Sequence, residues 1–514
     1  MKKTKNIEQI LSYKVLSKIA LITLLISLLP LMYCSFFDYA TGDDLWEGAV
    51  AYQVIQSGGS IIELFKAVFA WMKVDYLGWQ GNWSSTFLWC FSPNVFGEKV
   101  YCVTPWIGLI SICLGHWYCF KHFNQKYLKI KKEFFLILYA VITLLTIQYM
   151  PYIRGGIFWY SAMINYTFPY GLTMAIFVWI DKYLESGKKR YLTFLIFALS
   201  FLGGSGYLAI VLNFELLALI IFINLINKDN DKKRRALFLL IPLILLLIGF
   251  AISAMSPGNA VRGGDDYGFS IGNVFYTLKE CVVQGAIAIP VTMWRAKLLI
   301  LVSPFIAIGV WENLDSEKSK INFEHPILVT LFLFLISCSV YAPGIYANDQ
   351  LSGGVYDTIY FVFILVYFLV LIYITGYIKL RVGKENAKFK FRKKEIGIEQ
   401  IRSFGVIFVV VICIIGTPVI LNHSAYKVCV DFISSGQLKD FEAQMQERLE
   451  ILNDPTITDV VLPSMNDQQG PFMHMPAVED PSHYTNSCIA RFYGKNSVIC
   501  IPREEYYKLY GKEN

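Results

Sequence analysis

The sequence predicts an all-α polytopic membrane protein, with interfacial helices in its first outer loop and a small extracytoplasmic α/β or α+β domain at its C-terminus. Three observations predict this class. Of 514 residues, 55% are hydrophobic and only 17% charged, whereas soluble domains are about 25% charged. The mean hydropathy is +0.48. Apolar runs of about 20 residues, the length that crosses a bilayer core, recur along the chain.

The first crossing is predicted at about residues 18–37, after a polar and basic segment that keeps the N-terminus cytoplasmic. No small-residue cleavage signature follows it, so we interpret it as a retained anchor. An outer loop over about 38–98 comes next. Its amphipathic stretch Ile61–Val74 and aromatic segment Asp75–Trp83 predict one or two helices lying in the outer interface.

Ten further apolar runs bring the predicted number of crossings to about eleven, which places the C-terminus outside. They lie at about residues 100–120, 133–150, 166–183, 191–203, 206–227, 236–254, 296–311, 326–342, 357–379 and 404–422. Run 191–203 is short and ends in Gly203-Gly204-Ser205-Gly206, which is more typical of a helix break than of a phosphate loop. Residues 271–293 predict a re-entrant or interfacial helix.

The distribution of cations gives the orientation. Basic residues gather in the loops assigned to the cytoplasmic side, and the dense basic run 379–402 adds to them. In the other inside loops they are Lys121, Lys126, Lys129, Lys131, Lys132, Lys182, Lys188, Lys189, Arg190, Lys228, Lys232, Lys233, Arg234 and Arg235. The positive-inside rule therefore explains the net charge of +7, and we expect no nucleic-acid partner.

Residues 1–422 are predicted to form the membrane domain and residues 423–514 the outer C-terminal domain. The tail contains several turn-forming prolines and the β-rich segment Thr456–Leu462. Its three cysteines leave one disulfide and one thiol open as an alternative; they are Cys429, Cys488 and Cys500. No Cys/His cluster in the chain has metal-ligand spacing, so no metal site is predicted.

The polar stretch Asp38–Gly48, directly after the first crossing, is the candidate reaction centre. Its acidic pair, Asp43 and Asp44, repels itself and is costly to desolvate at a membrane boundary. One of the two is therefore expected to have a raised pKa, to bind a cation or to face a wet cavity. The spacing of Asp44 and Glu47 also fits a helix-capping pattern, which is the alternative role of Asp44.

The loops assigned to the outer face are rich in Gly, aromatic residues, Asn and Arg. Aromatic rings there can stack on sugars, and guanidinium groups can bind phosphate in bidentate fashion. An interfacial aromatic belt and cations that reach lipid headgroups are the alternatives. The candidate substrate-binding residues are Trp79, Asn82, Trp83, Arg154, Trp159, Asn259, Arg262, Arg295 and Tyr346.

Four short motifs resemble the GT-C class of integral membrane glycosyltransferases. They are Gly42-Asp43-Asp44, Trp79–Ser84, Ser256–Arg262, and Asp480–Asn486 before Tyr493-Gly494. The chain is most similar to a bacterial branch grouped with enzymes that decorate O-antigen, teichoic acid or other wall polysaccharide. One position departs from the pattern, because Asn82 stands where an arginine is expected.

The resemblance implies transfer of a sugar from a polyprenyl-phosphate carrier to an acceptor glycan of the cell envelope, at the outer face of the cell membrane. Asp43 or Asp44 would be the general base, and attack on the opposite face would invert the anomeric carbon. Arg154, Arg262 and Arg295 would stabilise the leaving phosphate. The scheme requires no cofactor, although an acidic pair is able to hold a divalent metal.

Two other membrane functions remain as alternatives, together with a structural scaffold for wall assembly. A lipid-linked glycan flippase would place charged residues and broken helices deep in the membrane, whereas here the polar groups collect at the outer face. A polysaccharide polymerase or ligase shares most of the features, but its large loop usually lies late in the chain.

Overall fold

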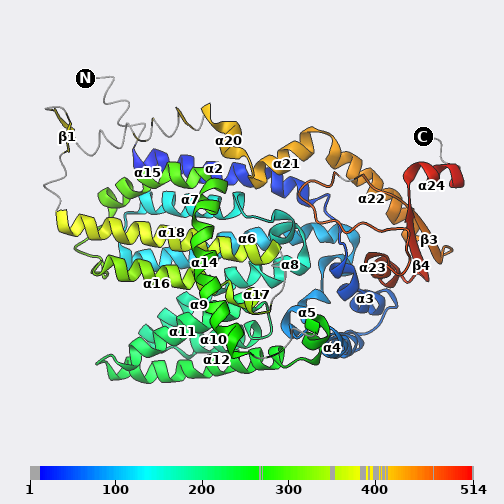
Figure 1. Cartoon of the computed structure of the whole chain (residues 1–514), viewed down its shortest axis with the longest axis horizontal. Coiled ribbons are helices and arrows are strands. Elements are labelled where there is room, and N and C mark those ends of the chain that lie inside the picture. Colours follow the sequence, from blue (N-terminus) through cyan, green and yellow to red (C-terminus); the bar gives the residue numbers. More distant parts are fainter. Residues whose placement is uncertain are drawn as a thin grey trace.

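The structure is a computed structural model. It describes residues 12–264, 268, 270–347, 353–382, 389–391, 394–396, 405, 407, 411, 412, 415–466 and 468–511. Figure 1 shows that most of the long helices run along the long axis of the molecule, and that the C-terminal part lies at one end. These helices are α2 (Tyr13–Ser35), α6 (Val103–Phe123), α7 (Lys132–Gln148), α9 (Thr167–Ser186), α10 (Lys189–Leu202), α11 (Tyr207–Leu225), α12 (Asn230–Ala254), α15 (Lys297–Asn313), α16 (Pro326–Ser339) and α18 (Gly353–Val382).

The described part of the chain contains seven helices long and apolar enough to cross a membrane: Tyr13–Ser35, Glu98–Leu128, Tyr160–Ser186, Tyr207–Leu225, Asn230–Ala254, Ile271–Arg295 and Gly353–Arg381. The prediction of a helical multi-pass chain is confirmed at this level. The predicted total of eleven membrane crossings stays a prediction. Four predicted crossings form shorter helices of 17, 14, 17 and 14 residues, namely α7, α10, α15 and α16. The predicted crossing at 404–422 is described only at residues 405, 407, 411, 412 and 415–422, where the longest helix is the short segment Thr417–Leu421.

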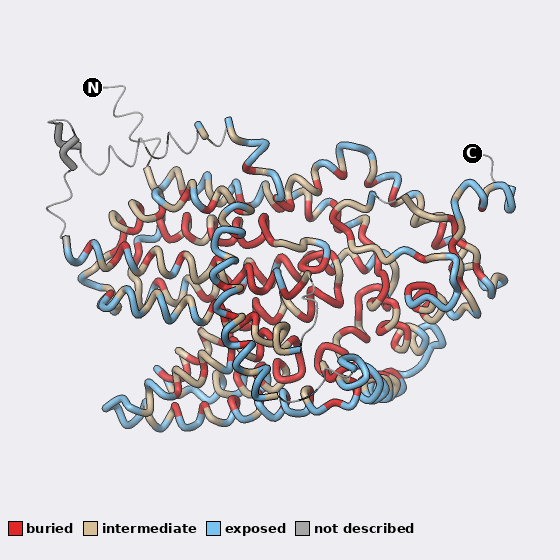
Figure 2. The backbone as a smooth tube through the Cα atoms, viewed as in Figure 1, coloured by how far each residue is buried: buried red, intermediate tan, exposed pale blue. Residues whose placement is uncertain are grey.

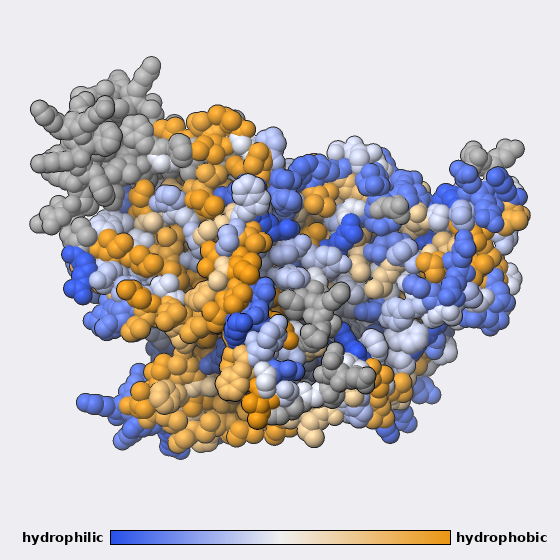
Figure 3. Space-filling model, viewed as in Figure 1, coloured by the Kyte–Doolittle hydropathy of each residue, from blue (hydrophilic) through white to orange (hydrophobic). Residues whose placement is uncertain are grey.

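Helix α14 (Ile271–Arg295) runs in a different direction from these helices and crosses them in Figure 1. Most of its exposed side chains are apolar and include Phe275, Leu278 and Trp294, whereas Asn273 and Lys279 are exposed polar residues. This helix is also long and apolar enough to cross a membrane, so its interfacial or re-entrant placement stays a prediction. Figure 3 shows hydrophobic surface along α14 and over the helical half, whereas the end with the C-terminal part is mostly hydrophilic.

The first outer loop contains three helices, α3 (Asp43–Gln56), α4 (Ile61–Gly78) and α5 (Trp83–Trp89), one more than the sequence predicted. The capping role predicted for Asp44 is wrong, because Gly42 precedes α3 and no side chain caps that helix. Gly42 has φ +53°, which favours glycine. The capping box belongs to α4 instead, where the Glu63 carboxylate accepts from the Ser60 amide at 2.7 Å.

Short elements join these parts of the chain. They are η1 (Pro93–Phe96), η2 (Glu98–Cys102), η3 (Asn124–Leu128), η4 (Arg154–Phe158), α8 (Tyr160–Asn165), α13 (Pro257–Gly263), α17 (Ala342–Tyr346), α20 (Thr417–Leu421) and the antiparallel pair β1 (Phe389–Phe391) and β2 (Lys394–Ile396). The C-terminal part contains α21 (Ala425–Ser434), α22 (Gln437–Asn453), β3 (Asp459–Pro463), α23 (Tyr484–Tyr493), β4 (Ser497–Ile501) and α24 (Arg503–Tyr510).

The C-terminal part is α/β. Strands β3 and β4 pair in parallel, and α23 lies between them in the chain, as a parallel connection requires. Strand β3 confirms the predicted β-rich segment. Cys429, Cys488 and Cys500 are free thiols, so the disulfide alternative is not realised.

The C-terminal part shares a hydrophobic core with the first outer loop. Phe492 of α23 stacks on Tyr52 of α3 with ring centroids 4.1 Å apart, and Val498 of β4 lies in the same buried cluster as Ala49 and Val95. Figure 2 shows buried residues concentrated where α5, α6 and α8 meet in the middle of the molecule. Segments more than 400 residues apart in the sequence therefore meet beside the acidic pair.

Candidate functional site

The two aspartates of the acidic pair have different surroundings. Both lie in the first turn of α3, which begins soon after α2 ends. Asp44 is completely buried. Its carboxylate accepts from the backbone amide of Ser161 at 2.8 Å, from the hydroxyl of the same residue, and from the Tyr101 hydroxyl. Asp44 thus holds α3 against α8 and η2, and its oxygens are occupied.

Asp43 is only half-buried. Its carboxylate accepts from the hydroxyl of Tyr484, in α23, at 2.7 Å. Tyr484 is itself 45% exposed. The Asp43 carboxylate therefore remains accessible from outside, which a proton-transferring group requires.

Three more carboxylates lie around the pair, and each is at most 4% exposed. Glu47 accepts from the indole N–H of Trp71 at 2.7 Å, and Asp75 accepts from the Thr86 hydroxyl at 2.8 Å. One oxygen of Asp38 accepts from the next backbone amide at 3.1 Å, and the other has no hydrogen-bond partner in the described part of the chain. These donors are neutral, so they provide hydrogen bonds to the carboxylates without neutralising their negative charge.

Burial raises the pKa of every carboxyl in this cluster. It raises the pKa of Asp44 to about 7, although Ser161 and Tyr101 oppose the shift. It raises the pKa of Asp75 to about 6, against the hydrogen bond from Thr86 and the charge of a nearby arginine. The pKa of Asp43 is raised by burial too, and the Tyr484 hydroxyl lowers it in part.

The remaining two carboxyls are perturbed more strongly. Burial, followed by the charge of Asp75, raises the pKa of Glu47 well above its usual value. Burial and the charge of Asp44 do the same for Asp38. Groups that titrate near neutrality and lie close to one another are typical of acid–base sites.

Two arginines flank the acidic cluster. The Arg491 guanidinium, from α23, lies 3.7 Å from the ring centroid of Trp71 and 4.3 Å from that of Trp46. Arg262, from α13, donates to the side-chain oxygen of Gln80 at 2.9 Å, and its charge lowers the pKa of Asp43 and of Asp75. Positive charge thus reaches the site from both sides.

Close packing of two of the predicted motifs positions Arg262. A Cβ at Gly81 would lie 1.8 Å from the carbonyl oxygen of Ser253, and one at Gly258 would lie 2.5 Å from the backbone nitrogen of Trp79. Asn259 accepts from the Gly81 amide at 3.0 Å and donates to the Ser253 carbonyl at 2.7 Å. The glycines are needed for this approach, and the Asn259 amide is used within the fold.

The two predicted tryptophans of the first loop, Trp79 and Trp83, differ in exposure and in their contacts. Trp79 is 51% exposed, and the Arg262 guanidinium lies 5.6 Å from its ring centroid. Trp83 instead donates to the backbone carbonyl of Gly249 at 3.2 Å, and its ring covers Gly204. Asn82 precedes α5, is half-buried and makes no side-chain capping bond. Trp79 is therefore the ring best placed to contact a ligand.

The other predicted residues contact different parts of the fold. Arg295 donates to three backbone carbonyls after α7, at 2.9, 2.9 and 3.2 Å. Arg154 is exposed and donates to the Gly470 carbonyl at 3.2 Å. Tyr346 binds backbone groups before α14, and Trp159 directly precedes α8. The structure brings together Asp43, Asp44, Trp79 and Arg262 from the predicted set.

Asp38 and Glu47 lie within the predicted reaction-centre stretch but were given no individual role, and sequence reasoning did not select Asp75, Tyr101, Ser161, Tyr484 or Arg491. A usable signal existed in α23. Tyr484, Cys488 and Arg491 are spaced at i, i+4 and i+7, which puts a tyrosine, a thiol and a cation on one helix face. Within the described residues, no three His, Cys, Asp or Glu side chains are arranged to hold a metal ion.

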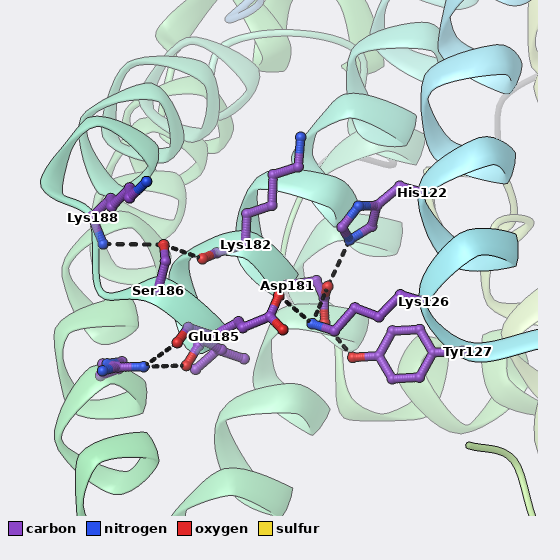
Figure 4. A network of polar contacts seen from close by, with 10 residues as sticks. His122, Lys126, Tyr127, Asp181, Lys182, Glu185, Ser186 and Lys188 are labelled. Carbon is purple, nitrogen blue, oxygen red and sulfur yellow. Dashed lines mark hydrogen bonds and ion pairs between the residues drawn. The ribbon is translucent and has the colours of Figure 1, made fainter. Parts of the chain in front are cut away.

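A large cavity lies at the opposite end of the bundle. It has a volume of about 800 Å³, and α6, α9, α11 and α18 line it with mostly apolar side chains. At its rim the Asp181 carboxylate accepts from His122 at 2.6 Å, from Lys126 at 2.7 Å and from the hydroxyl of Tyr127 (Figure 4). The first turn of α12 borders this cavity, whereas the last turn contacts the Trp79–Gly81 loop. A helix of 25 residues separates the two regions by about 37 Å.

Comparisons with protein-family models, curated proteins and solved structures found no match for this chain. The described part of the chain is mostly helical and includes seven helices long and apolar enough to cross a membrane. The site defines a half-buried carboxylate beside buried carboxyls and two arginines. A functional assignment therefore rests on this geometry and on the chemistry that it allows.

Proposed function

We propose that the protein is an integral membrane glycosyltransferase. It transfers a sugar from a polyprenyl-phosphate carrier to a cell-envelope glycan on the outer face of the cell membrane, with Asp43 as the general base. The observation that carries the proposal is the accessible Asp43 carboxylate at the start of α3, just beyond the first apolar helix and surrounded by buried carboxyls.

The roles of the acidic pair follow from their surroundings. An acceptor hydroxyl is a weak nucleophile, so a carboxylate must take its proton as it attacks the anomeric carbon. Asp43 can reach an acceptor, and the Tyr484 hydroxyl and the Arg262 charge favour its ionised form. Asp44 is enclosed by its donors and acts as a positioning residue. One base with attack from the opposite face gives inversion.

Arginines assist departure of the lipid phosphate in this scheme. Negative charge grows on that phosphate as the glycosidic bond breaks, and fixed cations stabilise it. Arg262 is the best candidate because it lies near Asp43 and beside the exposed ring of Trp79, on which a sugar can stack. Arg154 and Arg295 bind backbone carbonyls elsewhere and are weaker candidates.

The first test measures envelope glycan composition and linkage in a deletion strain that carries wild type, Asp43→Asn or Asp44→Asn. We expect the deletion to lack one sugar substituent. Asp43→Asn should be expressed without restoring it, and Asp44→Asn should restore it in part. Full restoration by Asp43→Asn would contradict the proposal. Accumulation of intact lipid-linked repeat units in the deletion would favour the polymerase or flippase alternative.

A further inference from the structure

The C-terminal part contains a buried arginine beside a small pocket. Arg448 lies on α22 and is only 4% exposed. The pocket has a volume of about 180 Å³, and its polar lining includes Arg448, Ser464, Gln469, His474 and Cys500. A volume of this size corresponds to about six water molecules at ~30 Å³ each, which is room for a phosphate or carboxylate group.

Arg448 has no carboxylate partner among the described residues. Its Nη2 donates to the Cys500 sulfur at 3.3 Å, and its Nε is buried without a hydrogen-bond partner in the described chain. A thiol is a weak acceptor. The adjacent Glu447 carboxylate binds Arg503 at 2.5 Å. A buried charge without a counter-ion is costly, so this arrangement calls for an anion.

The other polar groups of the pocket suit an anion as well. Burial, followed by the charge of Arg448, lowers the pKa of His474 to about 3. The imidazole is therefore neutral at physiological pH and has an N–H to donate. Gln469 adds a side-chain amide. The pocket has cationic and neutral donors together.

The pocket also lies next to the candidate reaction centre. The backbone amide of Met475, the residue after His474, donates to the Thr41 hydroxyl at 3.1 Å. The Met475 sulfur packs so closely on Gly42 that an added Cβ there would lie 1.9 Å from it. A pocket residue and Asp43 are thus each one residue from this contact.

We propose that the Arg448 pocket binds the carboxylate or phosphate group of an acidic sugar, with Arg448 as its charge partner and His474 and Gln469 as hydrogen-bonding residues. The binding of an anion stands on the geometry of the pocket alone. The assignment of that anion to the acceptor glycan rests on the proposed function. The pocket would then select acidic acceptors over neutral ones.

The test uses the purified full-length protein in detergent and four probes: glucuronate, glucose 6-phosphate, inorganic phosphate and neutral glucose. Calorimetry gives the Kd, and thermal unfolding gives the shift in Tm. We expect at least one acidic sugar to bind at least tenfold tighter than glucose and to raise the Tm. The two acidic sugars distinguish carboxylate from phosphate, and inorganic phosphate shows whether the sugar ring contributes. Equal responses to acidic and neutral sugars would overturn the proposal.

Variants of the pocket residues test whether the acidic sugar binds in this pocket. Arg448→Met should weaken binding of the acidic sugar at least tenfold. The matched control Arg503→Met should retain that binding because Arg503 already has a carboxylate partner. His474→Asn and Gln469→Leu, nearer the surface, should also weaken binding if Arg448→Met does not fold. Binding unchanged in these variants would overturn the proposal.

The two proposals can fail separately. Asp43→Asn should bind the acidic sugar with the wild-type Kd, because the carboxylate of Asp43 lies outside the pocket. If Asp43→Asn restores the glycan while the acidic sugar still binds through Arg448, the anion site stands and the acceptor assignment is lost. If transfer requires Asp43 but wild type binds no acidic sugar, the transferase stands and the pocket proposal is wrong.

Discussion

The two ends of α12 border regions in which carboxylates have opposite kinds of partner. At the cavity end, Asp181 is bound by the side chain of Lys126 at 2.7 Å and by His122 at 2.6 Å. At the other end, Asp44 is bound by hydroxyl and amide groups, and Glu47 by an indole N–H. The carboxylate of the first region forms direct ion pairs, whereas the carboxylates of the second accept hydrogen bonds from neutral donors.

This difference separates a structural network from a candidate reactive site. An ammonium group close to a carboxylate stabilises the ionised form, so the carboxylate does not readily take up a proton. Neutral donors fix the position of a carboxylate while its burial still opposes ionisation, so its pKa stays near neutrality. The Arg491 cation at the acidic end stacks on Trp46 and Trp71 and acts on Glu47 through its charge.

The largest expected effect comes from changing one aspartate at each end. Asp43→Asn should lower the transfer rate by about 10²–10⁴-fold, the usual contribution of a general base. Asp181→Asn removes the same charge but should leave the rate close to wild type and lower the Tm, because Lys126 loses one of its two carboxylate partners and keeps only Glu185. Rates in membranes and Tm values in detergent test this pair. Equal losses of rate would contradict the comparison.

The stacked arginine should have the next largest effect. Arg491→Met removes a cation between two rings, an interaction worth about 2 kcal/mol when desolvated, which is about 30-fold in an equilibrium constant. We expect the transfer rate to fall by up to about 30-fold. Arg190→Met is the matched control, because Arg190 stacks on Tyr191 at 4.8 Å far from the acidic cluster. A rate loss shared by Arg190→Met would show that the effect is not specific.

Much of the helical framework could be predicted because apolar length is a local property of the chain. Helices such as α6, α11 and α18 need only their own sequence to be recognised. Gly42-Asp43-Asp44 was recognisable for a similar reason, since its place after the first crossing is visible in the sequence. The alternative capping role of Asp44 is not realised, because local spacing suggested a cap while its partner Ser161 lies more than 100 residues away.

The rest of the site depends on contacts that no local pattern contains. Tyr484 reaches Asp43 across 441 positions of sequence, and the core formed by Phe492 and Tyr52 holds its helix there. Arg295 is a further example. The sequence shows only a lone arginine in an outer loop, whereas in the fold its guanidinium donates to the backbone carbonyls after α7.

A smaller effect should follow from removing one hydroxyl at each end. Tyr484→Phe removes the hydrogen bond that lowers the pKa of Asp43, so that pKa should rise. A base works only when ionised, so activity falls as the pH drops through its pKa, and the acid limb of the pH–rate profile should move to higher pH. We expect about one pH unit, which corresponds to ~1.4 kcal/mol. Tyr127→Phe, which removes a hydroxyl donor from Asp181, should leave the profile unchanged. An unshifted profile in Tyr484→Phe would remove this residue from the site.

The last expected effect is on stability, not on rate, and it follows from the burial of Asp44. Its pKa is about 7 in the folded protein against an ordinary 3.8, so the folded state binds the proton more tightly than the unfolded chain. This group therefore stabilises the fold fully below about pH 4, and its contribution is lost as the pH rises to about 7. Asp44→Asn has no proton to lose, so the Tm of wild type minus that of the variant should fall by a few degrees over this range. The exposed Glu450→Gln is the control. A difference that grows with pH would mean that Asp44 is held as an anion, like Asp181 with its ammonium partner, and the contrast between the two ends would disappear.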